Sequence, residues 1–137
     1  QLTLSQRATL AGAIIVSTPQ DLALIDARKG LNMFRKVNVP LIGIIENMSH
    51  FLCTQCGARH EIFGHGGAKA EAANLGVPFL GEVPLEMAIR ATSDEGMPIV
   101  ASQPDSPHAD HYRAIASTVL DTLEKNALKS GPKIVVD

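Results

Sequence analysis

Short apolar runs alternate with segments of helical period along most of this chain, and this alternation limits the folds open to it. A continuous apolar run is typical of a strand covered on both faces, whereas an amphipathic helix repeats its apolar residues every three or four positions. The expected strands are 12–17, 40–45 and 78–83, and the expected helices are about 19–37, 68–75, 85–95 and 107–128. Strands that alternate with helices form a mainly parallel sheet with helices on both faces. The sequence therefore predicts a doubly wound α/β fold.

Local signals predict where several elements begin and end. Thr18 followed by Pro19 is typical of an N-cap and a first helical position, and Gly76 is typical of a helix stop. The helix after Thr18 has one apolar face, which consists of Leu24, Ala27, Leu31 and Phe34. We expect the short apolar segment 98–101 to be a strand or an extended piece.

The length of the chain, 137 residues, corresponds to about one domain. We expect residues 1–129 to be part of a single domain with a cysteine-bearing loop at 47–63, and residues 130–137 to form a flexible tail. The chain opens at Gln1 without an initiator methionine, in what looks like the middle of a helix. We expect it to be a piece of something longer.

Charge and composition exclude several classes of function. The formal net charge is −2, and no run of Lys and Arg exceeds two neighbours, which argues against binding to nucleic acid or to an anionic membrane. No apolar run is long enough to span a bilayer, and the N-terminus lacks the pattern of a signal peptide. Two cysteines do not make a disulfide scaffold. We expect a cytoplasmic protein, with an organellar matrix as the alternative.

The pair Cys53-Thr-Gln-Cys56, followed by Gly57, is the sharpest chemical feature. Two residues between thiolates let both sulfurs face one metal, and the glycine lets the backbone curl around it. A thioredoxin-type redox pair is disfavoured, because such a pair uses a helix N-terminus and no helical period follows Cys56. The remaining two ligands could be His60 and His65, in a zinc site within one chain, or the same cysteines of a second copy, around a [4Fe–4S] cluster. Residue spacing leaves both open.

Other polar residues lie where the expected strands end. Asn47 follows the second strand, at the sheet edge where open parallel sheets bind ligands, and its amide could pair with a purine edge. Its ordinary role would be that of a turn residue. The segment 83–86 ends the third strand at the same edge. The glycine-rich segment 64–67 is not a Walker A sequence, and we expect it to start a helix.

Several motifs in a fixed order resemble one family. They are Val-Ser-Thr-Pro-Gln-Asp at 16–21, Asp-Ala-Arg-Lys-Gly at 26–30, Met-Phe-Arg-Lys-Val at 33–37, Glu-Asn-Met-Ser at 46–49, Cys-Thr-Gln-Cys-Gly at 53–57, Ile-Phe-Gly-His-Gly-Gly at 62–67 and Gly-Glu-Val-Pro-Leu at 81–85. This set resembles the Mrp/ApbC family of iron–sulfur cluster carrier ATPases, deviant Walker A P-loop NTPases that are similar to MinD and to the nitrogenase iron protein. The resemblance runs from Gln1 to about Leu123.

The resemblance implies a function and a set of site residues. Cys53 and Cys56 would hold a labile [4Fe–4S] cluster that bridges a homodimer through the cysteine loop, and would pass it to apo-proteins. Zinc is the alternative metal at these cysteines. Asn47 would contact the adenine of Mg-ATP, with Pro84, Leu85 and Glu86 lining the base pocket. The turn at 18–21 would add to the dimer interface.

Two departures from the family pattern limit what the resemblance implies. The residue after the first cysteine is usually proline in this family, and here it is Thr54. The glycine-rich Walker A loop is missing from the sequence, so the chain resembles only the C-terminal half of the proteins in this family. Without a phosphate-binding loop, this chain alone is not expected to hydrolyse ATP, and we assign no catalytic residue.

Overall fold

The computed structural model describes residues 2–129, and its main sheet is parallel. Its three strands are β1 (Ala13–Ser17), β2 (Leu41–Asn47) and β5 (Phe79–Val83), in the spatial order β1-β2-β5. β1 pairs with β2 and β2 pairs with β5, both in parallel. All three therefore end at the same edge of the sheet, as the apolar runs predict.

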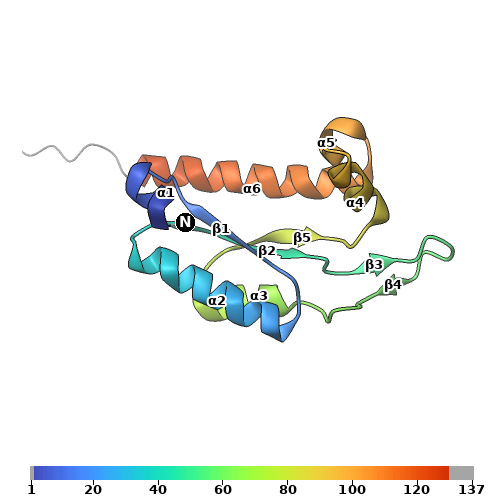
Figure 1. Cartoon of the computed structure of the whole chain (residues 1–137), viewed down its shortest axis with the longest axis horizontal. Helices are drawn as coiled ribbons and strands as arrows, with labels where there is room; N and C mark the ends of the chain where they lie inside the picture. Colours follow the sequence, from blue (N-terminus) through green and yellow to red (C-terminus); the bar gives the residue numbers. More distant parts are fainter. Residues whose placement is uncertain (1, 130–137) are drawn as a thin grey trace, which may run out of the picture.

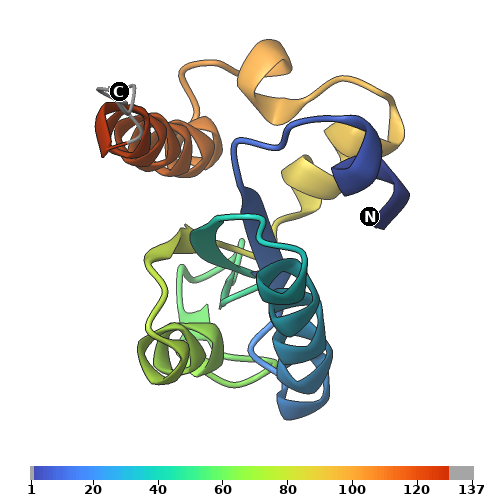
Figure 2. The ribbon, with the colours of Figure 1, turned by 90° about the vertical axis from the view of Figure 1, so that its left-hand side faces the viewer.

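Helices cover both faces of this sheet (Figure 1 and Figure 2). The helices are α1 (Leu2–Arg7), α2 (Asp21–Lys36), α3 (Gly67–Leu75), α4 (Met87–Asp94), α5 (Ile99–Ser102) and α6 (Pro107–Lys129). α2 and α3 lie on one face, and the long α6 lies on the other. This arrangement confirms the predicted α/β fold with helices on both faces.

The core divides into two apolar clusters, one on each face of the sheet. On one face, Ile15 and Ile44 of the strands pack with Leu24 and Leu31 of α2 and with small residues of α3. The other cluster joins the sheet to α6, and its members are Ile42, Leu80, Val83 and Ile115, flanked by Tyr112, Val119 and Leu123. Ala27 and Phe34 pack against the first cluster. The apolar face predicted for α2 is therefore the face that contacts the core.

A partly buried ion pair joins the two helices on the lower face of Figure 1. The Arg28 guanidinium of α2 makes two contacts with the Glu71 carboxylate of α3, at 2.5 and 2.8 Å. The Glu71 side chain is only 7% exposed, and hydrogen bonding to Arg28 lowers its pKa below the ordinary value. Arg28 thus stabilises the ionised form of a carboxyl group that burial alone would disfavour.

Two local predictions were wrong. α2 begins at Asp21 with Gln20 as its N-cap, and Thr18 instead donates a hydrogen bond to the Gln20 side chain at 2.8 Å. The turn is longer than predicted because Pro19 lies against Gly67 of α3, a contact that spacing does not reveal. The segment 98–101 is not extended: α5 forms there, since the carbonyl of Pro98 accepts backbone amides of the following turn.

The other predicted ends agree with the structure, apart from those that it does not describe. Gly76 is the C-cap of α3 in the left-handed conformation, as a helix stop requires. The tail expected at 130–137 lies outside the described residues. Within residues 2–129, no helix combines the length and the apolar character that crossing a membrane would need.

Candidate functional site

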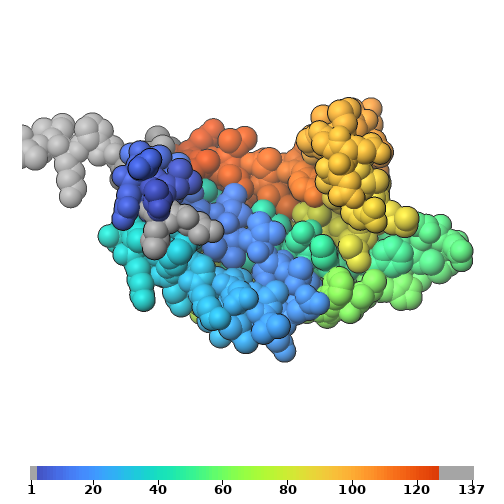
Figure 3. Space-filling view, in the orientation of Figure 1, coloured from blue at the N-terminus to red at the C-terminus, as the bar shows by residue number. Residues whose placement is uncertain are grey.

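A small hairpin projects from one end of the molecule (Figure 3), and Cys53 and Cys56 lie in the turn between its two strands. Strands β3 (Phe51–Leu52) and β4 (Arg59–His60) pair in antiparallel fashion. Across the tip, the amide of Cys53 donates to the carbonyl of Ala58 at 2.9 Å, and the amide of Gly57 donates to the carbonyl of Cys53 at 2.8 Å. Gly57 has a φ of 71°, so a glycine suits the turn after the second cysteine. Within the segment 47–63, where the sequence predicts a cysteine-bearing loop, the structure has a small hairpin.

Both cysteines are free thiols, Cys53 partly buried and Cys56 exposed. Backbone amides of Cys56 and Gln55 and the Cys56 thiol lower the pKa of Cys53, each by hydrogen bonding to its sulfur. Thiolate is the form of cysteine that binds metal. The tip therefore offers two sulfur ligands, one of them already biased toward its metal-binding state.

The histidines do not complete a metal site within the chain. His65 lies 3.2 Å from the Glu61 carboxylate, and the His60 ring lies against Phe51 with ring centroids 6.5 Å apart. Within residues 2–129, no three His, Cys, Asp or Glu side chains are grouped so that they could hold a metal ion. The structure thus does not assemble the zinc arrangement of Cys53, Cys56, His60 and His65 that spacing left open.

The four residues expected around adenine line one groove of about 550 Å³ beside the cysteine hairpin. These residues are Asn47, Pro84, Leu85 and Glu86. The amide of Met48 donates to Asn47 Oδ1 at 3.0 Å, so the Asn47 amide nitrogen remains available to a ligand. The structure brings the four residues together, and their contact with adenine stays a prediction.

Sequence reasoning missed most of the apolar wall of this groove. The wall is formed by residues from four separate parts of the chain, namely Met48, Phe51, Ile62, Met87, Ile89 and Tyr112. Phe51 belongs to β3, Ile62 follows β4, and Tyr112 comes from α6. Only the fold places them side by side, and the sequence carries no signal that would have found them.

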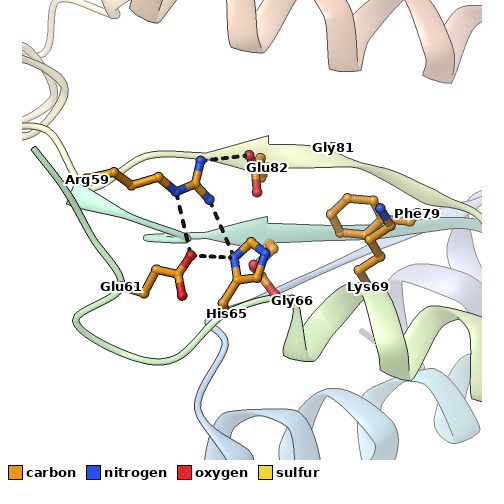
Figure 4. Close-up of a pocket in the computed structure, with 9 residues that line it drawn as sticks. Arg59, Glu61, His65, Gly66, Lys69, Phe79, Gly81 and Glu82 are labelled. Carbon is orange, nitrogen blue, oxygen red and sulfur yellow. Dashed lines mark hydrogen bonds and ion pairs between the residues drawn. The ribbon is translucent and has the colours of Figure 1, made fainter. Parts of the chain in front are cut away.

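A second cavity, of about 540 Å³, lies beneath the hairpin and is lined by charged side chains (Figure 4). Glu46, which is completely buried near the end of β2, is one of the residues that line it. Its Oε2 accepts the amide of Ala68 in the first turn of α3 at 2.7 Å, and its Oε1 has no hydrogen-bond partner among the described residues. A carboxyl group at the end of an apolar strand is a sequence signal for this cavity, but residue spacing alone gives it no role.

Solved structures place this chain in the class of MinD-like folds. MinD of Pyrococcus furiosus superposes with a TM-score of 0.64 at 22% identity, over 81% of this chain and 43% of that one. A nucleotide-binding protein from Archaeoglobus fulgidus, in complex with ADP, has a TM-score of 0.60 at 38% identity over 69% of this chain and 39% of that one.

The sequence matches identify the family within that class. The family described as ParA, NUBPL iron-transfer P-loop NTPase, matches residues 1–120, and the chain belongs to this family. The iron-sulfur cluster transfer protein NUBPL of Dictyostelium discoideum is 48% identical over 98% of this chain and 43% of its own length. The iron-sulfur cluster carrier protein of Escherichia coli is 48% identical over 87% of this chain and 32% of its own length. The chain thus spans less than half the length of these relatives.

Proposed function

We propose that the chain carries an iron–sulfur cluster as cargo on Cys53 and Cys56 and transfers it to apo-proteins. The observation that carries the proposal is the projecting hairpin tip with two free thiols, one of them with a lowered pKa. Exposed, weakly enclosed ligands suit a cluster that must leave again. The names of the relatives, which describe iron–sulfur cluster transfer and carrier proteins, support the same cargo.

We extend the proposal to a homodimer bridged by the cluster. A [4Fe–4S] cluster takes four cysteine ligands, and one chain offers two. A second copy related by a two-fold axis would present the same two thiols to the same cluster. The tip projects from the body of the molecule (Figure 3), so the hairpin tips of two copies could approach each other without a clash between the rest of the two chains.

We also propose that the groove at Asn47 binds the adenine of a nucleotide in the longer protein. Its apolar wall suits a flat base, and the amide nitrogen of Asn47 could donate to the ring edge. The sequence contains no Gly-Lys-Ser/Thr phosphate-binding motif, so we expect this chain to bind nucleotide weakly and to hydrolyse none.

Anaerobic reconstitution with iron and sulfide tests the cargo. We expect the absorption of a [4Fe–4S] cluster, two chains per cluster, and release of the cluster to an apo-ferredoxin. Cys53→Ser and Cys56→Ser should each abolish both the absorption and the dimer, because each removes two of the four ligands. Thr54→Ser, in the same loop, is the control and should behave like the wild type.

Two results would contradict the proposal. The first is a cluster and a dimer that survive Cys53→Ser. The second is purified protein that holds zinc without sulfide and takes up no iron on reconstitution, which would favour a structural zinc role instead.

Amide NMR spectra recorded with and without ADP test whether the groove binds a nucleotide. ADP should shift resonances of Leu85 and its neighbours, and Asn47→Ala should weaken this response while Asn126→Ala, on the exposed side of α6, leaves it unchanged. Shifts that do not depend on Asn47 would remove that residue from the site.

A further inference from the structure

The cysteine hairpin is attached to the sheet mainly on one side. β3 and β4 form a separate two-stranded sheet. On the side that leads into β3, the amide of Ser49 donates to the carbonyl of Val83 at 3.1 Å, and the amide of Leu85 donates to the carbonyl of His50 at 2.7 Å. The arm that leaves through β4 has no comparable backbone bond to the main sheet among the described residues, so side chains must hold it.

Arg59 of β4 makes these side-chain contacts (Figure 4). Its Nη1 lies 3.8 Å from Glu82 Oε1 on β5, and its Nη2 lies 3.4 Å from His65 Nδ1 in the segment before α3. Its Nε lies 3.7 Å from Glu61 Oε1, just after β4. One guanidinium thus contacts the hairpin arm, the sheet and the start of a helix.

Two of the residues that Arg59 contacts, Glu82 and His65, are attached to well-packed parts of the molecule. Glu82 is part of β5, which pairs with β2 through its whole length. His65 lies two residues before α3, and the start of α3 is fixed by the hydrogen bond from Ala68 to the buried Glu46 carboxylate. Arg59 therefore connects the hairpin to two rigid parts of the molecule.

We propose that Arg59 is a positioning residue that sets the direction in which the hairpin presents Cys53 and Cys56, an inference that rests on the proposed cluster-carrying function. Arg59 is directly opposite Leu52, the residue before Cys53, in the β3–β4 register. A shift of the backbone at Arg59 and Leu52 would therefore also move Cys53, the first sulfur ligand. The planar guanidinium can serve three partners at once, whereas a lysine ammonium would act as a single point charge.

The contribution of Arg59 to overall stability should be small. Its side chain is 40% exposed, and ion pairs at exposed positions add little to the free energy of folding. Groups that orient metal ligands nevertheless affect metal retention strongly, typically by about 10–100-fold. A positioning role and a merely structural role therefore predict different results.

The test compares Arg59→Gln, Arg59→Lys and a control in the reconstituted protein. The control is Arg90→Gln, because Arg90 forms an ion pair with Asp94 of its own helix and is 81% exposed. The measurement is the rate at which a chelator removes iron, followed by absorbance. We expect Arg59→Gln to lose its cluster about tenfold faster than the wild type, Arg59→Lys to lie between them and Arg90→Gln to match the wild type, all with similar melting temperatures of the metal-free protein.

A cluster-free measurement accompanies this one. In the metal-free protein, ¹⁵N relaxation should show greater mobility of residues 51–60 in Arg59→Gln than in Arg90→Gln. If the wild-type protein holds a cluster and Arg59→Gln loses it no faster than Arg90→Gln, the positioning role is overturned. The proposed function then still stands. A wild-type protein that takes up no cluster overturns the proposed function, and the relaxation measurement then still decides whether Arg59 holds the hairpin.

Discussion

Glu46 shows how a single buried carboxyl group can organise a neighbouring helix. A carboxylate without exposure to solvent is costly unless it is hydrogen-bonded, and Glu46 is completely buried. One of its oxygens accepts the amide of Ala68, a group at the N-terminus of α3 that has no partner within the helix. The positive end of the helix dipole also favours a negative charge at this place. Glu46 thus links the end of β2 to the start of α3.

Replacement of Glu46 by alanine should destabilise the fold. The variant leaves the Ala68 amide buried without a partner, which costs about 1–3 kcal/mol. Urea denaturation should show a lower midpoint with an unchanged slope. Glu124→Ala, on the exposed surface of α6, is the control, with an effect within about 0.5 kcal/mol. Equal stability of Glu46→Ala and the wild type would show that Glu46 does not cap α3.

His50 should make stability depend on pH. Burial lowers the pKa of His50 below its ordinary value of 6.5, and the charge of Arg59 lowers it further, against the opposite influence of Glu82. The unfolded chain therefore binds a proton more readily than the folded one, so stability falls as pH drops below about 6.5 and stops falling below the folded-state pKa. Urea midpoints measured across this range should fall less in His50→Gln than in the wild type. Parallel slopes for His50→Gln and the wild type would refute this role.

At the scale of elements, two glycines in helices differ in whether a close contact requires them. Gly67 opens α3, and a Cβ at this position would lie 2.5 Å from the carbonyl oxygen of Pro19. Gly30 lies inside α2, and a Cβ there would meet only the tip of Ile15 at 3.8 Å. The first glycine is needed because two segments touch, whereas the second is not needed by any contact.

Alanine at these two positions should change stability in opposite directions. Gly30→Ala should stabilise the protein by about 0.5–1 kcal/mol, since alanine loses less entropy within a helix. Gly67→Ala should destabilise it, because the backbone of Pro19 would have to move away from α3. Thermal unfolding of both variants checks the signs, and a stabilised Gly67→Ala would mean that this contact is easily relaxed.

At the scale of the whole molecule, the edge strand β1 exposes apolar side chains. β1 pairs with β2 on one side, and Ile14 and Val16 of this strand are 36% and 58% exposed. An edge strand with exposed apolar side chains is a template for pairing with another chain. The groove beside it, between β1 and α2, has a volume of about 780 Å³.

This edge should make the metal-free chain associate with itself. Val16→Lys should reduce the association, because a charge on an edge strand opposes pairing with another strand. Leu120→Lys, at a similarly exposed apolar residue of α6 (59% exposed), is the matched control and should leave it unchanged. Sedimentation velocity over a range of concentrations measures the effect. A wild-type chain that stays monomeric throughout, or equal association of the two variants, would contradict the prediction.

Most of the fold could be predicted, and the exceptions have a common cause. Apolar runs and helical periods located the three main strands and the four longer helices, since these signals depend on local spacing. The predictions for the start of α2 and for α5 were wrong, because the segments 18–20 and 98–102 are too short to show a period of their own. The cysteine pair was evident from spacing alone. The charged cavity around Glu46 and Arg59 was not, because its residues come from four separate segments.

The sequence by itself determined the α/β class, the order of the elements, the cysteine pair and the family, because each depends on residues close together in the chain or on motifs in a fixed order. The tertiary structure decided how these parts meet. It separated His60 and His65 from the cysteines as metal ligands, gathered Asn47 and Pro84 into one groove with Phe51, and placed Arg59 between the hairpin and the sheet. Contacts between distant segments follow from how helices and strands pack, so periodicity and short motifs in the sequence do not predict them.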